Sequence, residues 1–464
     1  MTMLLRSVEL EGDVVDVRIA GGRIVQIGPG LSGDAAIVEG RGGALIPGLA
    51  DHHLHILATA ARRASVAIDD VADIDAIAAR LAAVEGLGWI RAVGCPAVLA
   101  DAMTRDDLDV MVPDRPLRMQ DQTGALWLLN GAALDRVLAG LGAGDWPASV
   151  ERDAKGRPTG RIWRGDDWLR GRMATDPPDL APLGRELARY GVTALADASV
   201  SNDARSAALL AEAVRTGTLP QRLMLMSAGP LTAPADGAFT VGPVKLLIDT
   251  RALPPFDAMV ANIADAHDRG RAAAVHCVTA TELAFTLAAF TEAGCQDGDR
   301  IEHGSVIAPD AIAAIREAGL RVVTQAGFIA ARGDRYLRDV AAQDRPDLYR
   351  AASLLNAGIR VAGSSDAPYG PLDPWIGMAT SIDRRAPSGA VIGALEGLTP
   401  RAALDRYLSP LDDPGGPVRR VAVGGPADLC LLDRPLDRAL AAPSSAHVRA
   451  TWRDGTMIYR YGDI

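Results

Sequence analysis

The amino-acid sequence predicts an α/β fold, a (β/α)8 TIM barrel, with a small β-sandwich domain formed by both ends of the chain. Two observations predict the barrel. First, several short apolar runs end in a residue that can be a metal ligand. Four of these residues, Lys245, His276, His303 and Asp366, are separated by 31, 27 and 63 residues. A βα unit takes about 30 residues, so the last gap fits two units. Second, Ala-rich helical segments that stop at a glycine lie between these runs.

Both chain ends carry hairpin patterns. Apolar and polar residues alternate over residues 14–27 around Gly21-Gly22, and a similar pattern over residues 448–460 surrounds Asp454-Gly455. Glycine supplies the positive φ that a two-residue hairpin turn needs. An isolated hairpin is at best marginally stable. We therefore expect residues 1–44 and 418–464 to form one composite β-sandwich domain, and residues 45–417 to form the barrel.

The first barrel strand leads into two histidines that can share a metal ion. Residues 45–54 are largely apolar and deliver Asp51-His52-His53-Leu54-His55. Residues two apart in a strand point to the same face, so His53 and His55 can ligate one ion, whereas His52 points to the opposite face. The pair alone is weak evidence, because a histidine-rich strand end also forms hydrogen-bonded turns. Asp51 is predicted to orient a ligand histidine.

A long insertion is predicted next. About 135 residues separate His55 from the next barrel strand at residues 192–196, far more than one crossover needs, which places an insertion at about residues 65–185. A helical pattern covers residues 74–84, and a β-like run covers residues 89–94. The tryptophans of this stretch either pack its core or form a lid over an apolar substrate group; they are Trp127, Trp146, Trp163 and Trp168.

The remaining barrel helices repeat one pattern. Apolar residues recur every three or four positions, which predicts helices over residues 204–216, 257–269, 281–293, 309–318 and 350–357, each followed by a glycine. Residues 321–325 supply a strand in the long gap before Asp366. Residues 410–425, rich in proline and glycine, are predicted to link the barrel to the β-sandwich.

Composition limits the classes of function. The chain has 464 residues, 48% of them hydrophobic, and a formal net charge of −10, which is typical of a soluble globular protein and unlike a general nucleic-acid-binding surface. The sequence shows neither a secretory signal nor an apolar run long enough to span a membrane. Four scattered cysteines form no disulfide framework, so we expect reduced thiols and a cytoplasmic location.

At these residues the chain resembles the amidohydrolase superfamily of metal-dependent hydrolases. The run Pro47-Gly48-Leu49-x-Asp51-x-His53-x-His55 and the later candidate ligands match that family's pattern in order. Residues 122–130, 151–160 and 191–197 are similar to the N-substituted formamide deformylase (YtcJ-like) branch. The chain departs from the branch at two places. Thr123-Gly124-Ala125 stand where the branch usually has a histidine, and Cys277-Val278-Thr279 follow His276 in place of a Gly-Asp pair.

The resemblance implies a metal centre. His53, His55 and Asp366 would hold one divalent ion, most simply Zn²⁺, with His276 and His303 available for a second. Lys245 would bridge the ions as a CO₂-derived carbamate, since an unmodified ammonium has no lone pair. A lysine in the apolar run 244–248 is costly to bury unless it is modified or paired, so a salt bridge is the alternative. A mononuclear site that uses fewer of these groups stays open.

The implied reaction is hydrolysis of a C–N bond in an amide, formamide or cyclic amide by metal-activated hydroxide. Asp366 would carry the proton to the leaving nitrogen; an N-cap or strand-end turn is its structural alternative. A hydrolytic deaminase is the second function. Deaminases of this superfamily commonly have a glutamate soon after the strand-five histidine and lack the lysine, whereas here Lys245 is present and Glu282 is the first acidic residue after His276. A non-catalytic binder is disfavoured because every ligand type is retained.

Other residues near the ligands are expected to have structural roles. Strand alternation predicts that Cys277 and Glu302 point away from the barrel interior. His267 and His447 lie outside the ligand strands. Tyr369 and Arg384-Arg385 are predicted in a solvated loop, with contact to an anionic substrate group as the alternative. The expected partner is a small-molecule substrate, without nucleic acid or membrane, and a homo-oligomer is compatible with the sequence.

Overall fold

The computed structural model describes residues 2–173 and 177–462, which form two compact units. The barrel unit contains the chain up to Ile56 and from Leu180 onward, and the insertion unit runs from Leu57 to Asp179. The sequence predicts an insertion at about residues 65–185, and the insertion unit covers most of that stretch.

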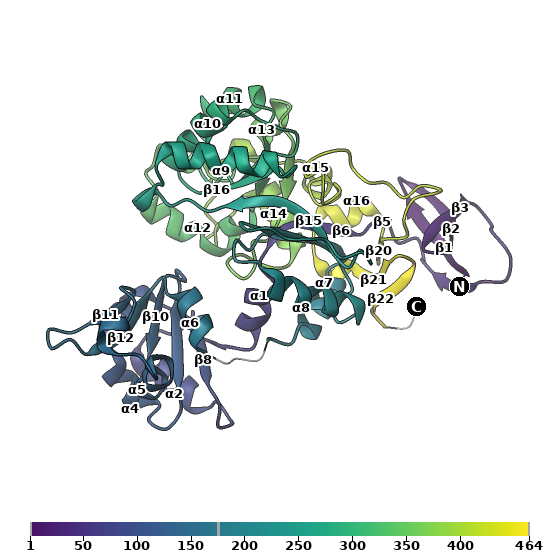
Figure 1. Ribbon diagram of the computed structural model, residues 1–464. Coiled ribbons are helices and arrows are strands. Elements are labelled where there is room, and N and C mark those ends of the chain that lie inside the picture. The colour runs from purple at the N-terminus through teal and green to yellow at the C-terminus, as the bar shows by residue number, and fades with distance from the viewer. Residues whose placement is uncertain (1, 174–176, 463–464) are drawn as a thin grey trace. The chain divides into compact units, whose positions relative to one another are not determined.

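The barrel unit is built on eight parallel strands that form a nearly closed barrel surrounded by helices, which confirms the predicted fold (Figure 1). Neighbouring strands pair in the order β6-β13-β14-β15-β16-β17-β18-β19. Their bounds are β6 (Leu49–Leu54), β13 (Val192–Asp197), β14 (Arg222–Ser227), β15 (Thr240–Leu246), β16 (Ala273–Cys277), β17 (Arg300–His303), β18 (Arg321–Thr324) and β19 (Val361–Gly363). Strand β14 was not predicted, because its apolar run carries no candidate ligand.

The barrel helices begin and end close to the predicted positions. Helices α9 (Phe256–Asp268) and α11 (Ala311–Glu317) stop just before Gly270 and Gly319, whose φ values of +68° and +67° are the left-handed conformation that ends many helices. The other helices of this unit are α7 (Ala181–Arg189), α8 (Ala204–Arg215), α10 (Ala280–Ala293), α12 (Gly327–Asp339), α13 (Ala352–Asn356), α14 (Pro374–Asp383), α15 (Pro400–Asp405) and α16 (Leu436–Ala441).

Strand alternation sorts the side chains into two layers. On β16, Ala273, Val275 and Cys277 belong to a buried cluster that includes Met259 and Ile263 of helix α9. The intervening Ala274 instead packs in a small cluster with Ala196 of β13 and Met224 and Met226 of β14. Cys277 therefore packs in the core, as predicted. His276, two residues after Ala274, lies on the inner face of the strand, which carries the site.

Both chain ends contribute to two small sheets that share one core. The first sheet has the order β3-β2-β1-β4 and the second the order β22-β21-β20-β5. Leu5 and Ile19 from the first sheet pack with Leu431 and Trp452 from the second. The strands are β1 (Thr2–Leu10), β2 (Asp13–Ala20), β3 (Arg23–Gly28), β4 (Ala36–Glu39), β5 (Leu45–Pro47), β20 (Leu429–Leu432), β21 (Val448–Arg453) and β22 (Thr456–Arg460).

The insertion unit has its own sheet, with the order β11-β12-β10-β9-β8-β7. Trp127, Trp146 and Trp168 pack into one of its apolar clusters, whereas Trp163 is 42% exposed. Its elements are α1 (Ile56–Arg63), whose first residue belongs to the barrel unit, β7 (Val66–Ala67), α2 (Ile74–Ala82), β8 (Ile90–Cys95), α3 (Ala97–Ala102), α4 (Arg105–Met111), β9 (Leu117–Asp121), β10 (Leu126–Leu129), α5 (Gly131–Leu138), β11 (Val150–Arg152), β12 (Pro158–Trp163) and α6 (Asp166–Arg172).

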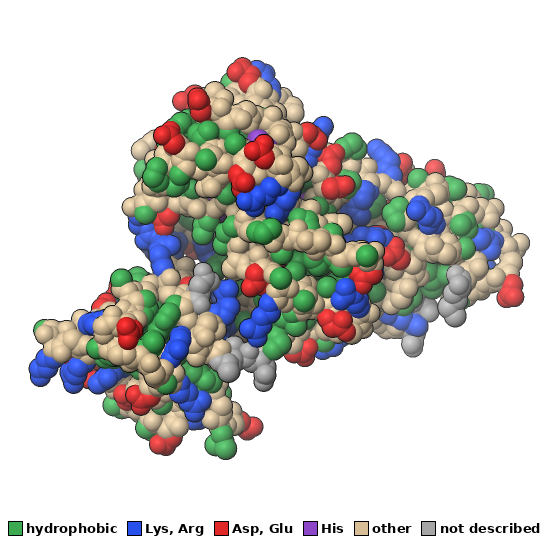
Figure 2. Space-filling view, in the orientation of Figure 1, with side chains coloured by type: hydrophobic (Ala, Val, Ile, Leu, Met, Phe, Trp, Pro, Cys, Tyr) green, Lys and Arg blue, Asp and Glu red, His purple; other side chains and the backbone are tan. Residues whose placement is uncertain are grey.

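The surface carries both signs of charge. On the face shown in Figure 2, acidic and basic side chains are intermingled over the visible residues. All four cysteines are free thiols, and three of them are buried. Across the described residues, no helix combines the length and the apolar character that a membrane span requires.

Candidate functional site

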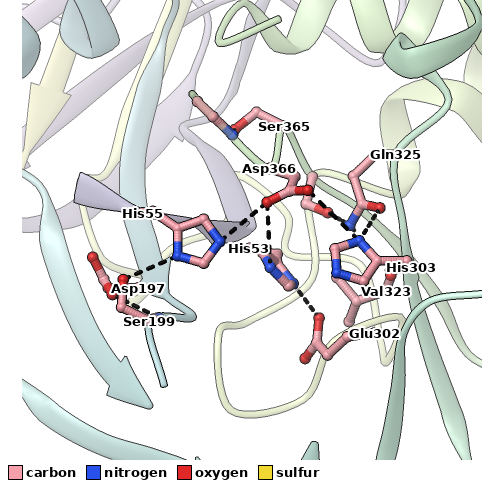
Figure 3. Close-up of polar contacts among 12 residues, drawn as sticks. His53, His55, Asp197, Ser199, Glu302, His303, Val323, Gln325, Ser365 and Asp366 are labelled. Carbon is pink, nitrogen blue, oxygen red and sulfur yellow. Dashed lines mark hydrogen bonds and ion pairs between the residues drawn. The ribbon is translucent and has the colours of Figure 1, made fainter. Parts of the chain in front are cut away.

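Two histidines and a carboxylate meet at one end of the barrel (Figure 3). Asp366 Oδ1 lies 3.2 Å from Nε2 of His55 and 3.5 Å from Nε2 of His53. One ligand atom from each of the three residues lies within 4.8 Å of the others. A tetrahedral Zn²⁺ site uses this kind of nitrogen and oxygen donor set. The structure thus brings together the three residues predicted to hold one ion.

The backbone fixes these side chains. His53 is on β6 and His55 follows it, and both point to the barrel interior as their two-residue spacing predicts. Asp366 follows β19 and has a φ of +52°, in the left-handed region that aspartate tolerates better than most residues. Its carbonyl oxygen accepts hydrogen bonds from the backbone N–H groups of Tyr369 (2.8 Å) and Gly370 (3.1 Å). Asp366 therefore begins a turn at the strand end.

Asp51 connects the two strand ends. Its Oδ1 accepts hydrogen bonds from the backbone N–H groups of His53 (3.2 Å) and Ser365 (3.1 Å). Burial raises the pKa of Asp51 to about 6, against the lowering effect of its bonds to Ser365 and His53. Asp51 was predicted to orient a ligand histidine, and its hydrogen bond to His53 is with the backbone N–H of that residue.

His55 has a hydrogen-bond partner that the sequence analysis did not identify. Its Nδ1 lies 3.0 Å from Oγ of Ser199, which leaves Nε2 toward Asp366. Ser199 lies in the loop after β13. The carboxylate of Asp197, at the end of β13, holds this loop by accepting hydrogen bonds from the backbone N–H groups of Ser199 (2.9 Å) and Ile56 (2.7 Å). The signal was present, since residues 191–197 form an apolar run that ends in an aspartate.

The second pair of predicted ligands lies beside the first group. The rings of His276 and His303 have centroids 4.5 Å apart, and His303 lies 4.7 Å from the His53 ring. His303 Nδ1 is 3.7 Å from Asp366 Oδ2 and 2.9 Å from Oε1 of Gln325, another partner that sequence reasoning missed. Neither His276 nor His303 joins the three-residue ligand group in the described structure. They adjoin it as a separate pair.

The prediction that Glu302 points away from the barrel interior is wrong. Its carboxylate Oε2 contacts Nδ1 of His53, and its Oε1 accepts a 2.6 Å hydrogen bond from Arg300. The prediction assumed regular alternation with His303 inside. Instead, His303 has a φ of +70°, which breaks the extended backbone at the strand end. Both Glu302 and His303 consequently face the site.

Lys245 lies inside the barrel, and none of the described residues forms a hydrogen bond with its Nζ. Its side chain is 3% exposed and its Nζ is buried and unbonded. Burial lowers the pKa of Lys245, and Glu302 and Asp366 oppose this effect. A lowered pKa favours the neutral amine, which has the lone pair that reaction with CO₂ requires. A buried Nζ without a partner also agrees with a modification that carries its own oxygens, such as a carbamate.

The charge states of the site suit a cation. Burial lowers the pKa of His53, of His276 to about 4, and of His303 well below its usual value, so these rings are neutral near pH 7. Burial alone would raise the pKa of Asp366, but the bond to His55 and the nearby histidines lower it overall. Asp366 is therefore ionised, and its buried Oδ1 faces Nε2 of both His53 and His55. Neutral imidazoles beside an ionised carboxylate fit a divalent metal ion.

Other predicted residues lie outside this constellation. His52 is fully buried against Ser409, and His267 pairs with Asp299. The prediction of a solvated loop is wrong for Arg384, which is 1% exposed and bonds to carbonyl oxygens, including that of Tyr349 at 3.1 Å. Tyr369 is 44% exposed and its ring meets His55 edge-on at 5.6 Å.

Comparisons with known proteins agree with this architecture. The sequence matches the model of the Amidohydrolase family over residues 36–459. It is 24% identical to an N-substituted formamide deformylase from Arthrobacter pascens, over 96% of this chain and 94% of that protein. It is 22% identical to YtcJ of Bacillus subtilis (strain 168), named as a proposed amidohydrolase, over 74% of each chain. The crystal structure of an uncharacterized metal-dependent hydrolase from Pyrococcus horikoshii OT3 has the same fold, with a TM-score of 0.76, 18% identity, and coverage of 97% of this chain and 100% of that one.

Proposed function

This chain belongs to the amidohydrolase family, and from that membership we propose that it hydrolyses a carbon–nitrogen bond in an amide, formamide or cyclic amide. The observation that carries the proposal is the convergence of the Asp366 carboxylate on Nε2 of His53 and Nε2 of His55. The relative from Arthrobacter pascens is named for N-substituted formamides, which makes this substrate class the first to test.

His53, His55 and Asp366 would hold the first divalent ion, most simply Zn²⁺. His276, His303 and a carbamate on Lys245 are the groups for a second. When bound, such a cation would polarise a carbonyl oxygen and lower the pKa of a water molecule, so that hydroxide is available to attack near neutral pH. The buried, unpaired Nζ of Lys245 supports the carbamate, because an unmodified ammonium at that position would be costly.

Asp366 is suited to move the proton. Its Oδ1 faces His53 and His55, and its Oδ2 faces His303, so the carboxylate lies between the two groups of histidines. An ionised carboxylate accepts a proton from the attacking water and returns it to the leaving nitrogen, which is general acid–base catalysis. The lowered pKa of Asp366 keeps it in the accepting form.

Glu282 favours amide hydrolysis over deamination. The deaminase alternative needs a glutamate near His276 that is free to exchange protons with the substrate. Glu282 is 2% exposed, and its Oε2 accepts the backbone N–H groups of Val278 (2.7 Å) and Thr279 (3.1 Å) at the start of α10. Its Oε1 accepts hydrogen bonds from the backbone N–H and from the hydroxyl of Thr250, both at 2.8 Å. Both oxygens of Glu282 are therefore occupied in stabilising the start of α10 and the adjoining loop at Thr250, and are not free to exchange protons with a substrate.

A substrate panel tests the proposed reaction. Zinc-loaded protein would be incubated with N-benzylformamide, an N-acetylated amine, a cyclic amide and a heterocyclic amine. We expect an amine plus a carboxylic acid, or a ring-opened acid, and loss of this activity in His55→Ala. Release of ammonia from the heterocyclic amine alone would favour the deaminase. Hydrolysis that persists in His55→Ala would contradict the site.

A further inference from the structure

We propose that Glu302 is a positioning residue for the candidate metal centre: it fixes which ring nitrogen of His53 faces Asp366, and Arg300 holds Glu302 in place for that purpose. The inference rests on the proposed function, because it concerns the same site. It assigns a role to two charged residues of β17 that the proposed reaction does not otherwise use.

Glu302 and His53 form a direct contact across the barrel. Oε2 of Glu302 meets Nδ1 of His53, and Nε2 on the other side of the ring is 3.5 Å from Asp366 (Figure 3). The side chains of Glu302 and His53 are 0% and 1% exposed, so solvent water does not compete for this contact. The two residues are 249 positions apart in the chain, and only the folded barrel brings them together.

This contact selects one form of the His53 ring. A neutral imidazole has one N–H and one lone pair, and an ionised carboxylate can only accept hydrogen bonds. With Glu302 at Nδ1, the proton resides on Nδ1 and the lone pair is on Nε2, toward Asp366. A carboxylate on the far nitrogen also makes a histidine a more basic ligand. Glu302 thus prepares His53 to bind a cation through Nε2.

Arg300 holds Glu302 in the required orientation. The two oxygens of Glu302 have different partners, since Oε1 accepts a 2.6 Å bond from Nε of Arg300 while Oε2 meets His53. The Arg300 side chain is 1% exposed. Rotation of the Glu302 carboxylate would break both contacts at once. The pair therefore works as a rigid support behind His53.

The contact is distinctive among the candidate ligands. In the described residues, Nδ1 of His55 lies against the hydroxyl of Ser199, and Nδ1 of His303 lies against the amide oxygen of Gln325. Those two hydrogen-bond partners are neutral, whereas the partner of His53 Nδ1 is an anion. Removing the charge of Glu302 should consequently weaken cation binding through His53 more than through the other two rings.

The experiment measures metal binding, without reference to turnover. Zinc affinity would be determined by competition with a chromophoric chelator, and the visible spectrum of bound Co²⁺ would report the ligand geometry. The variants are Glu302→Gln and the double variant Arg300→Met/Glu302→Gln, which removes both buried charges and leaves neither unpaired. We expect zinc binding weakened about 10- to 100-fold in both, with an altered Co²⁺ spectrum.

Asp299→Asn is the matched control. Asp299 directly precedes β17 and also pairs with a histidine, 3.0 Å from Nε2 of His267, away from the candidate ligands. We expect parental zinc affinity for this variant. Circular dichroism would verify that each protein is folded.

A folded double variant with parental affinity and a parental Co²⁺ spectrum would overturn the inference, because Glu302 would then serve only to pair Arg300. A parent that binds zinc but hydrolyses no amide would contradict the proposed function and not this inference. A parent that binds no zinc would overturn both.

Discussion

Asp366 donates its backbone N–H to the carbonyl oxygen of His53 at 2.8 Å, and the side chains of the same two residues approach to 3.5 Å. The adjoining N–H of His55 donates to the carbonyl oxygen of Ala367, also at 2.8 Å. These bonds join the ends of the first and last strands of the barrel. One set of backbone contacts therefore links the two edges of the nearly closed barrel and positions the ligand group, so side-chain substitutions there can remove function and leave the fold intact.

Lys245→Ala is expected to lose most hydrolytic activity, and short carboxylic acids added to the buffer should restore part of it. The small acid would occupy the space of the carbamate and supply its oxygens. Activity would be measured with and without acetate or propionate. The chain has only one other lysine, Lys155, so Lys155→Ala is a matched control that should keep parental activity.

Intact-mass analysis of the parent and Lys245→Ala complements this measurement. The parent should carry the mass of one added CO₂ under non-denaturing conditions, and the variant should not. Parental activity in Lys245→Ala would make the residue structural and would remove the support for a two-ion centre.

Asp366→Asn is expected to lower kcat by about 10²- to 10⁴-fold, because the amide keeps an oxygen near His53 and His55 but cannot accept the proton. KM should change little. The pKa of Asp366 is held below the usual carboxylate value, so the parent keeps this group ionised across the neutral range. The acidic limb of the pH–rate profile should accordingly be lost or displaced in the variant. An unchanged kcat with an unchanged acidic limb would assign the proton transfer to another group.

His52→Gln is expected to make folding less sensitive to acid. Burial lowers the pKa of His52 from 6.5 to about 3, so His52 gains a proton on unfolding between these pH values. Its contribution to stability is complete above pH 6.5 and is lost as the pH falls toward 3. Each pKa unit corresponds to about 1.4 kcal/mol, which gives a total effect of roughly 5 kcal/mol over the whole pH range.

Urea unfolding of the metal-free protein between pH 7.5 and pH 4.5 would measure this effect. Glutamine can still bond to Ser409, which His52 contacts at 3.1 Å, but does not titrate. The free energy of unfolding should therefore fall less steeply with acid in His52→Gln. Parallel curves for parent and variant would contradict this account of His52.

The periodic features of the chain could be predicted from the sequence. Barrel strands that end in candidate ligands recur with the spacing of βα units, and this spacing predicted the barrel. The resemblance to the amidohydrolase superfamily then implied the group of His53, His55 and Asp366 that the structure brings together. Helix ends at glycines such as Gly270 were predicted because only local conformation is involved. These features depend on residues close in sequence or on a repeated topology.

The supporting contacts could not be predicted in the same way. The position of Glu302 depends on the φ of +70° at His303, which strand alternation does not include. Ser199 and His55 are 144 residues apart, and their contact depends on how a loop returns after β13. Arg384 was predicted in a solvated loop, yet it fills a buried position where three carbonyl oxygens accept its hydrogen bonds. Such contacts depend on the packing of particular loops.

The most direct test of the account is the number of metal ions bound per chain in the parent, His53→Ala, His55→Ala and the control His447→Ala. His447 lies outside the barrel interior. Its Nε2 is 3.1 Å from the carbonyl oxygen of Ala442. Metal content would be measured by elemental analysis after removal of free metal, and circular dichroism on the same samples would verify folding. We expect one or two ions per chain in the parent and in His447→Ala, and a clear loss of metal in folded His53→Ala and His55→Ala. Full metal occupancy in folded His53→Ala or His55→Ala would contradict the assignment of the metal centre.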